Sequence, residues 1–204
     1  YASLKNEEST KDSVQTAGRV MGVRDMGKIS FLTLNDESGK IQIVLQELRT
    51  PQKIIEFVRK YIDTGDFIGV KGEVFRTKKG ELSIHALEVT LLSKSLLPLP
   101  DKWHGIEDKE ERYRKRYLDL IMNPEVRQTF ILRSKIVEVV RQLLKEEGFL
   151  EVETPSIQSM YGGASAQPFV THINALNIKA YLSISPELYL KRLIVGGYER
   201  VFTI

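Results

Sequence analysis

Three side chains in the first half of the sequence could together recognise a nucleotide base. Phe31 and Gln42 lie in two neighbouring segments of alternating apolar and polar residues, and Arg24 comes just before the first of them. An exposed aromatic ring can stack on a splayed base for about 1 to 3 kcal/mol, an amide can hydrogen-bond its Watson–Crick edge, and a guanidinium can do either. Simpler interpretations are open, because Phe31 could belong to a core, Gln42 to a solvent-facing strand surface and Arg24 to an ordinary loop.

A second candidate is Glu187, which follows Ser185 and Pro186 at the start of a predicted helix. A partly buried carboxylate there would favour a charged ammonium partner. A carboxylate in a first helical turn also interacts with the helix dipole, for about 0.3 to 1 kcal/mol, and on sequence chemistry alone this second explanation is preferred. Upstream, Gly163 could allow the backbone to approach a ligand closely, because glycine has no Cβ.

A run of charges, KEERYRKR, covers residues 109–116 of a predicted helix. Glu111 stands four residues before Lys115, a spacing that forms helical ion pairs worth tenths of a kcal/mol each. We favour a solvated, ion-paired helix face here over direct contact with a nucleic acid.

The composition limits the class of protein. The 204 residues contain no cysteine, which excludes disulfides and thiolate metal sites, and we expect no metal site in this chain. No apolar run is long enough to span a bilayer, so we expect no membrane partner and a soluble, reducing, cytoplasmic location. The net charge of +3 neither requires nor excludes a nucleic-acid partner.

The elements that must position Arg24, Phe31 and Gln42 are strands. Alternating segments at residues 20–23, 30–34, 41–45, 67–74 and 82–91 predict five strands. Gly39 and Gly80 end two predicted hairpin turns, and residues 51–61 predict a short amphipathic helix between the third and fourth strands. Five strands with one helix in this place predict an all-β OB-fold barrel.

The pattern changes after residues 97–101, LPLPD, which suit neither a helix nor a central strand. Beyond them we expect helices at 107–121 and 125–147, a strand at 149–153, a strand at 179–185, a helix at 186–195 and a strand from residue 200. The expected division is therefore a barrel domain at 1–96, a linker at 97–106 and an α+β domain at 107–204, with an antiparallel sheet and helices. The strand at the end lacks a closing turn, so we expect the chain to be truncated.

Several long motifs in the second region resemble one known family. GFLEVETP at 148–155, after a long amphipathic helix, is similar to motif 1 of class II aminoacyl-tRNA synthetases. The segments YGGASAQPF, SPELYLKRL and GGYERVF follow it, and PLPDKWHGIEDKEERYRKRYLDLI precedes it. Together with residues 17–46, these segments resemble lysyl-tRNA synthetases over nearly the whole chain.

The resemblance implies roles for particular residues. Glu187 and the backbone of Gly163 match the residues that hold the α-ammonium of lysine. Arg24, Phe31 and Gln42 match the readers of the central anticodon uridine. Glu81 matches a contact to the third anticodon base.

The resemblance also implies lysine–tRNA ligase activity, with lysine, ATP, Mg²⁺ and tRNA(Lys) as substrates and cofactors. Lysine attacks the α-phosphate of ATP to give lysyl-adenylate, and the terminal ribose hydroxyl of the tRNA then takes the lysyl group. The motif 2 arginine and the groups that hold ATP and Mg²⁺ are expected beyond Ile204, so no catalytic residue is expected within the chain, and the chain alone is expected to be inactive. Motif 1 implies a homodimer through residues 125–155.

Two other interpretations are open. Aspartyl and asparaginyl synthetases of the same subclass also carry an N-terminal OB-fold, but the aspartyl type usually has glutamine where this chain has Glu187. A protein-lysylating relative would lack the barrel. From a different class, the chain could be a non-catalytic module that binds tRNA and dimerises.

Overall fold

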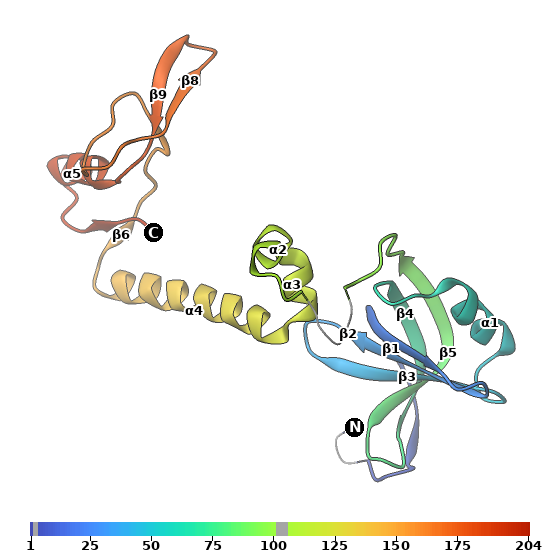
Figure 1. Cartoon of the computed structure of the whole chain (residues 1–204). Helices are drawn as coiled ribbons and strands as arrows, with labels where there is room; N and C mark the ends of the chain where they lie inside the picture. Colours follow the sequence, from blue (N-terminus) through green and yellow to red (C-terminus); the bar gives the residue numbers. More distant parts are fainter. Residues whose placement is uncertain (2–3, 101–105) are drawn as a thin grey trace. The chain divides into compact units, whose positions relative to one another are not determined.

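Five strands of the N-terminal half form the barrel that the alternating pattern predicts (Figure 1). This computed structural model describes residue 1 and residues 4–100 and 106–204, apart from the side chain of Lys11. The strands and the helix between them are β1 (Ser9–Asp25), β2 (Ile29–Asn35), β3 (Lys40–Gln46), α1 (Gln52–Tyr61), β4 (Phe67–Arg76) and β5 (Leu82–Ser93). The order around the barrel is β1-β2-β3-β5-β4, and β4 pairs again with β1.

The first strand is longer than the sequence pattern indicated. It begins at Ser9 rather than Val20, because its first half pairs with β4 while its second half pairs with β2. A strand that pairs with two different neighbours along its length must be long. The N-terminal half of β1 is mostly polar, so it shows no alternation of apolar and polar residues.

The core of the barrel is apolar and comes from alternate residues of each strand. In β2, Leu32 and Leu34 are buried, whereas Phe31 and Thr33, which alternate with them, are only half-buried and face outward. Ile55 and Val58 of α1 pack into the same core. At one β4–β5 contact the strands approach so closely that a β-carbon on Gly72 would lie 1.9 Å from the His85 carbonyl oxygen, so only glycine fits there.

Both predicted hairpin turns are confirmed. Asp36 N donates to the Gly39 carbonyl at 3.0 Å, and Gly80 N donates to the Thr77 carbonyl at 2.9 Å. Gly80 has a φ of +83°, a left-handed conformation that favours glycine.

The second half contains helices and short strands, as the α+β prediction requires. These are α2 (Lys109–Arg114), α3 (Arg116–Met122), α4 (Pro124–Glu146), β6 (Leu150–Glu151), β7 (Ile157–Gln158), β8 (Val170–Ile173), β9 (Ile178–Leu182), α5 (Glu187–Val195) and β10 (Val201–Phe202). The predicted helix at 107–121 is divided between α2 and α3 at Lys115. Strands β7 and β8 were not predicted, because they are too short to show a period in the sequence.

The expected antiparallel pairing holds for β7, β9 and β8, while β10 pairs with β6 in parallel. A parallel pair needs a long crossover, and the roughly fifty residues between these two strands supply one. The second half is therefore a mixed α+β arrangement.

Two compact units account for the described residues, Tyr1–Leu118 and Asp119–Ile204, with the division inside α3. Residues 101–105 of the expected linker lie outside the described residues. The assignment of domains to 1–96, 97–106 and 107–204 therefore remains a prediction. No helix in the described ranges is long and apolar enough to cross a membrane.

Candidate nucleic-acid interface and amino-acid site

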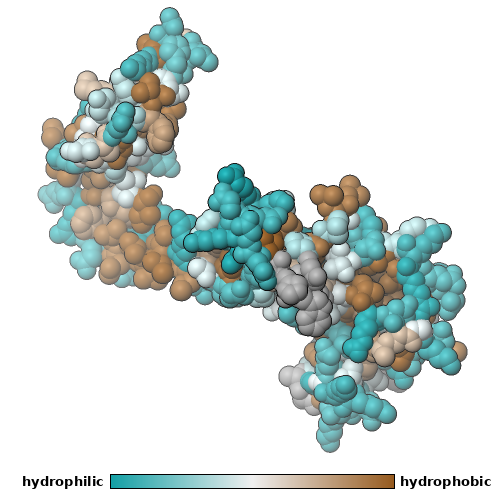
Figure 2. Space-filling model, in the orientation of Figure 1, coloured by the Kyte–Doolittle hydropathy of each residue, from teal (hydrophilic) through white to brown (hydrophobic). Residues whose placement is uncertain are grey.

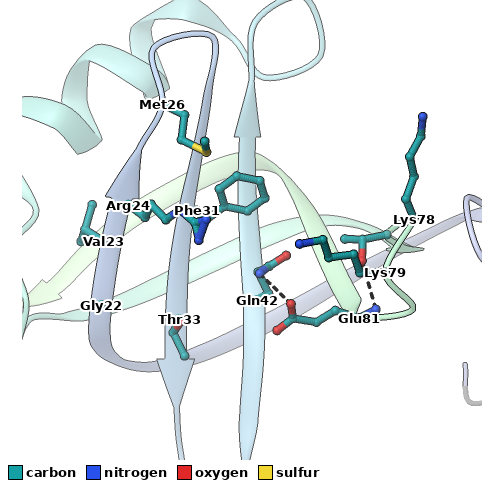
Figure 3. Close-up of a pocket in the computed structure, with 11 residues that line it drawn as sticks. Gly22, Val23, Arg24, Met26, Phe31, Thr33, Gln42, Lys78, Lys79 and Glu81 are labelled. Atoms are coloured by element: carbon teal, nitrogen blue, oxygen red, sulfur yellow. Dashed lines mark hydrogen bonds between the residues drawn. The ribbon is translucent and has the colours of Figure 1, made fainter. Parts of the chain in front are cut away.

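The four residues expected to read a nucleotide lie around one groove on the outer face of the barrel. Arg24, Phe31, Gln42 and Glu81 all line this groove, which has a volume of about 620 Å³. They come from β1, β2, β3 and the turn before β5, so only the closed barrel brings them together (Figure 3).

Strand register explains why the first three face the same way. Arg24 pairs with Phe31 across β1 and β2, and residues directly opposite in antiparallel strands share a face. Gln42 lies opposite Thr33, two residues from Phe31 and on the same face. Phe31 does not belong to the core cluster, so the alternative interpretation of this residue as a core side chain is wrong.

Hydrogen bonds fix the amide of Gln42. Its Nε2 donates to a carboxylate oxygen of Glu81 at 2.9 Å (Figure 3). Its Oε1 accepts from the Ser83 hydroxyl at 3.0 Å. The amide retains one N–H and one oxygen lone pair, which can serve a ligand as donor and acceptor. A uracil edge presents a complementary acceptor and donor.

The turn beside Arg24 is held by an ion pair. The carboxylate of Asp25 accepts from the Ser30 hydroxyl at 2.9 Å and from Gly27 N at 3.0 Å, and it lies 2.9 Å from Nε of Arg59 on α1. Hydrogen bonding, first from Ser30 and then from Arg59, lowers the pKa of Asp25. This clamp fixes the β1–β2 turn between Arg24 and Phe31.

Other residues of the groove were not predicted from the sequence. Lys78 and Lys79 line it from the β4–β5 turn, and Met26 and Thr33 also contribute to its wall. The two lysines add positive charge beside a candidate base-stacking ring, which suits a polyanion. The TKKG turn was identified in the sequence, but a hairpin turn gives no signal of which groove its side chains will join.

Gly163 and Glu187, the candidate residues of the amino-acid site, also lie together. Gly163 has a φ of +88°, and a β-carbon on it would lie 3.2 Å from the β-carbons of both Glu187 and Ser185. The Ser185 hydroxyl accepts from Glu187 N at 3.2 Å at the start of α5. The glycine loop therefore packs on the first turn of the helix that carries the carboxylate.

The carboxylate of Glu187 already holds an ammonium group. Its Oε1 lies 2.5 Å from Nζ of Lys191, one helical turn further on. Exposed pairs of this spacing are worth only about 0.3 to 0.5 kcal/mol, so a bound ammonium can replace Lys191 at little cost. The helix-dipole explanation of Glu187 is compatible with the same geometry.

Two family models match the chain. Residues 108–204 match class II tRNA synthetases of the D, K and N type, and residues 14–92 match the OB-fold nucleic acid binding domain. Residues 108–204 therefore belong to the class II tRNA synthetase family, and residues 14–92 to the OB-fold nucleic acid binding domains.

Curated relatives agree on the subgroup. The heat-inducible lysine–tRNA ligase of Escherichia coli K12 is 55% identical over 197 residues, which are 97% of this chain and 39% of that protein. The lysine–tRNA ligases of Dehalococcoides mccartyi CBDB1 and Yersinia enterocolitica are 54% and 53% identical over 198 and 206 residues, covering 40% and 41% of their lengths. The synthetase chain thus spans about two fifths of the length of these relatives.

The charge run of this class II chain forms the expected helical pairs. Arg114 lies 2.7 Å from Glu110, and Lys115 lies 2.8 Å from Glu111. The hydrogen bond from Lys115 to Glu111 raises the pKa of Lys115. These pairs support the interpretation of this segment as a solvated helix face.

Helix α4 leaves its apolar side chains exposed. Among the described residues, none on α4 is buried, and Figure 2 shows hydrophobic side chains gathered over this helix. Seven large apolar residues of α4 are exposed: Phe130, Ile131, Leu132, Ile136, Val139, Val140 and Leu143. One end is tied to β6, because Arg141 Nε donates to both carboxylate oxygens of Glu151, at 2.7 and 2.9 Å.

The described residues hold no cluster of three His, Cys, Asp or Glu side chains that could bind a metal ion. They therefore do not fit a Mg²⁺ site by themselves.

Proposed function

We propose that this chain acts in lysyl-tRNA synthesis, with the barrel binding the anticodon of tRNA(Lys). The observation that carries the proposal is the single groove lined by Arg24, Phe31, Gln42 and Glu81. An aromatic ring beside an oriented amide and a guanidinium can stack one base and read its edge. The names of the relatives, all lysine–tRNA ligases, support tRNA(Lys) as the RNA.

In this proposal Phe31 stacks on the central uridine, and Gln42 reads its Watson–Crick edge through the N–H and lone pair that remain free. Arg24, directly opposite Phe31, adds a hydrogen bond or a phosphate contact. Glu81 contacts the third anticodon base while its other oxygen orients Gln42.

We further propose that residues 108–204 contribute to the lysine pocket. Glu187 holds the α-ammonium of lysine, and the Gly163 backbone packs against it because no Cβ intervenes. ATP with Mg²⁺ would supply the adenylyl group that activates the lysine carboxylate, with pyrophosphate as the leaving group. The contribution of these residues is to position the amino acid by charge pairing.

The homodimer is part of the same proposal. Seven exposed apolar side chains on one helix exceed what a soluble surface ordinarily leaves uncovered. A second copy that packs α4 and the strand after it would cover them, and a two-fold axis would make the contact self-complementary. A cytoplasmic location fits this function.

The experiment that tests the anticodon proposal is a titration of the chain with an anticodon stem-loop of tRNA(Lys) at fixed salt. The same stem-loop with cytidine in place of the central uridine is the matched ligand. We expect the uridine loop to bind at least tenfold more tightly, about 1.4 kcal/mol, because cytidine reverses the donor and acceptor at the edge that Gln42 reads. Equal affinity for the two loops would contradict the proposal.

A further inference from the structure

The outer face of the barrel continues past the groove to a second cationic position. Phe31 pairs with Val44 across β2 and β3, and Val44 pairs with His85 across β3 and β5. These three residues form one outward row. Val44 is only 3% exposed yet lies outside the core cluster, so neighbouring side chains cover it on this outer face.

His85 is fixed within this row. It is 5% exposed, and its ring stacks on Phe75 with 3.7 Å between ring centroids and 10° between planes. Burial, and then the nearby charge of Arg49, lower its pKa from 6.5 to about 4, so the ring is neutral.

The imidazole orients an arginine. Nη1 of Arg49 lies 2.9 Å from Nε2 of His85, and because a guanidinium can only donate, Nε2 is the acceptor. The proton of the neutral ring is then on Nδ1. Nδ1 is buried and has no hydrogen-bond partner among the described residues. The position of this ring beside Arg49 therefore costs the free energy of one buried, unsatisfied donor.

The charge of Arg49 is not neutralised. Arg59, Arg114 and Arg141 each pair with a carboxylate, whereas no carboxylate of the described residues forms an ion pair with Arg49. A neutral acceptor orients a guanidinium without cancelling its charge, and the remaining donors can still bind an anion in a forked geometry.

The loop that carries Arg49 is also unusual. Leu48, immediately before it, has a φ of +72° and is fully exposed. A left-handed conformation at a leucine costs on the order of 1 kcal/mol or more, and such strain is found most often at functional sites. Two backbone hydrogen bonds to the Gln46 carbonyl, from Arg49 N and Thr50 N, hold this turn.

We propose that Arg49, oriented by His85, binds a backbone phosphate of the RNA next to the nucleotide that stacks on Phe31. This inference rests on the proposed anticodon function and adds one binding residue, Arg49, and one positioning residue, His85. The ligand group is a phosphodiester, because the site offers an oriented, unneutralised guanidinium on the same face as the stacking ring and no group that would read a base. It therefore contributes affinity and salt dependence but no base selectivity.

The test measures the affinity of the 204-residue chain for the uridine and cytidine stem-loops at several salt concentrations. Loss of one phosphate contact on a single strand lowers the slope of log affinity against log salt by about 0.7 and weakens binding about fivefold at 0.1 M salt. We expect both changes for Arg49→Gln, with the uridine-to-cytidine ratio unchanged. Lys135→Gln, the same charge change at an exposed position of α4, should alter neither.

Variants of His85 test whether this residue orients the Arg49 guanidinium or only packs in the barrel. His85→Gln keeps an acceptor near Arg49 and should retain most of the parental salt slope, whereas His85→Leu removes it and should lower the slope as Arg49→Gln does. Thermal unfolding of each variant shows that the barrel remains folded. A parental slope and affinity for Arg49→Gln, in a chain that still distinguishes uridine from cytidine, would overturn this inference alone. Failure of the parent to distinguish the two loops would instead overturn the proposed function and this inference with it.

Discussion

The amide of Gln42 and the carboxylate of Glu81 are joined by a 2.9 Å hydrogen bond, although the two residues are 39 apart in the sequence. This bond sets which end of the Gln42 amide faces the groove. We therefore expect Glu81→Ala to weaken binding of the uridine stem-loop by about 0.5 to 1.5 kcal/mol and to reduce the preference for uridine over cytidine. Glu88→Ala removes an exposed carboxylate that pairs with Lys71 on the same barrel, and it should leave both quantities unchanged. An unchanged uridine preference in Glu81→Ala would show that Gln42 does not depend on Glu81.

In the proposed function, Phe31 supplies the surface on which a base stacks. Phe31→Ala should weaken the stem-loop by about 1 to 3 kcal/mol, while Phe31→Tyr should bind nearly as well as the parent because the ring is retained. The control is Phe67→Ala, which removes an exposed ring elsewhere on the barrel, whose centroid lies 4.2 Å from the Arg19 guanidinium. Fluorescence titration at fixed salt measures all three, and equal affinity of Phe31→Ala and the parent would remove Phe31 from the site.

The proposed role of Glu187 is tested in a protein of the full length of the relatives that contains this chain, so that the whole proposed pocket is present. If its carboxylate holds the α-ammonium of lysine, Glu187→Gln should lower kcat/KM in lysine-dependent ATP–pyrophosphate exchange by at least tenfold, about 1.4 kcal/mol. Binding of the stem-loop should not change. The helix-dipole explanation predicts normal exchange and a loss of tenths of a kcal/mol in stability, so exchange and thermal unfolding of one variant separate the two explanations.

The apolar side of α4 should drive self-association. We expect the chain to sediment as a dimer or larger species at micromolar concentration, and Val140→Glu to weaken association by about 1.5 to 3 kcal/mol, the value of one buried aliphatic side chain. Lys135→Glu introduces the same residue at an already polar position of the helix and is the control. A sharp monomer for the parent chain would contradict the proposed dimer.

The buried imidazole of His85 makes the stability of the barrel depend on pH. The pKa of His85 in the folded chain, about 4, is below its usual value of 6.5, so between these values the unfolded chain binds a proton that the folded chain does not. The free energy of unfolding should therefore fall by on the order of 2 kcal/mol as the pH is lowered from about 6.5 to about 4, and His85 should add no pH dependence above this range. The carboxylates also lose stabilising interactions as pH falls, but they do so equally in His85→Gln. Hydrogen exchange of the barrel amides should show a smaller pH dependence in that variant, and identical pH profiles would contradict this account.

Much of the barrel followed from local pattern. Period-two alternation identified β2 and β3 nearly to the residue, because each has one apolar and one polar face. The same test failed for the start of β1, where residues between Ser9 and Val20 owe their strand conformation to pairing with β4. Local strand propensity contains no information about a partner strand that lies about fifty residues away in the sequence.

The groove could be predicted in part for a similar reason. Chemical type singled out Arg24, Phe31 and Gln42, and resemblance added Glu81, all of which the barrel brings together. Nothing in the sequence singled out Lys78 or Arg49, because the sequence around a charged turn residue is the same whether its side chain faces solvent or a groove. The row from Phe31 to His85 depends on the parallel pairing of β3 with β5, which local alternation does not show.

That parallel pairing has a consequence for synthesis of the chain on the ribosome. When β3 has emerged, the nascent chain already contains Phe31 and Gln42, but Glu81 and His85 arrive only after α1 and β4 have been made. Gln42 then has neither Ser83 nor Glu81 to orient its amide. In the proposed function, selective binding of RNA therefore requires β5 to be paired with β3.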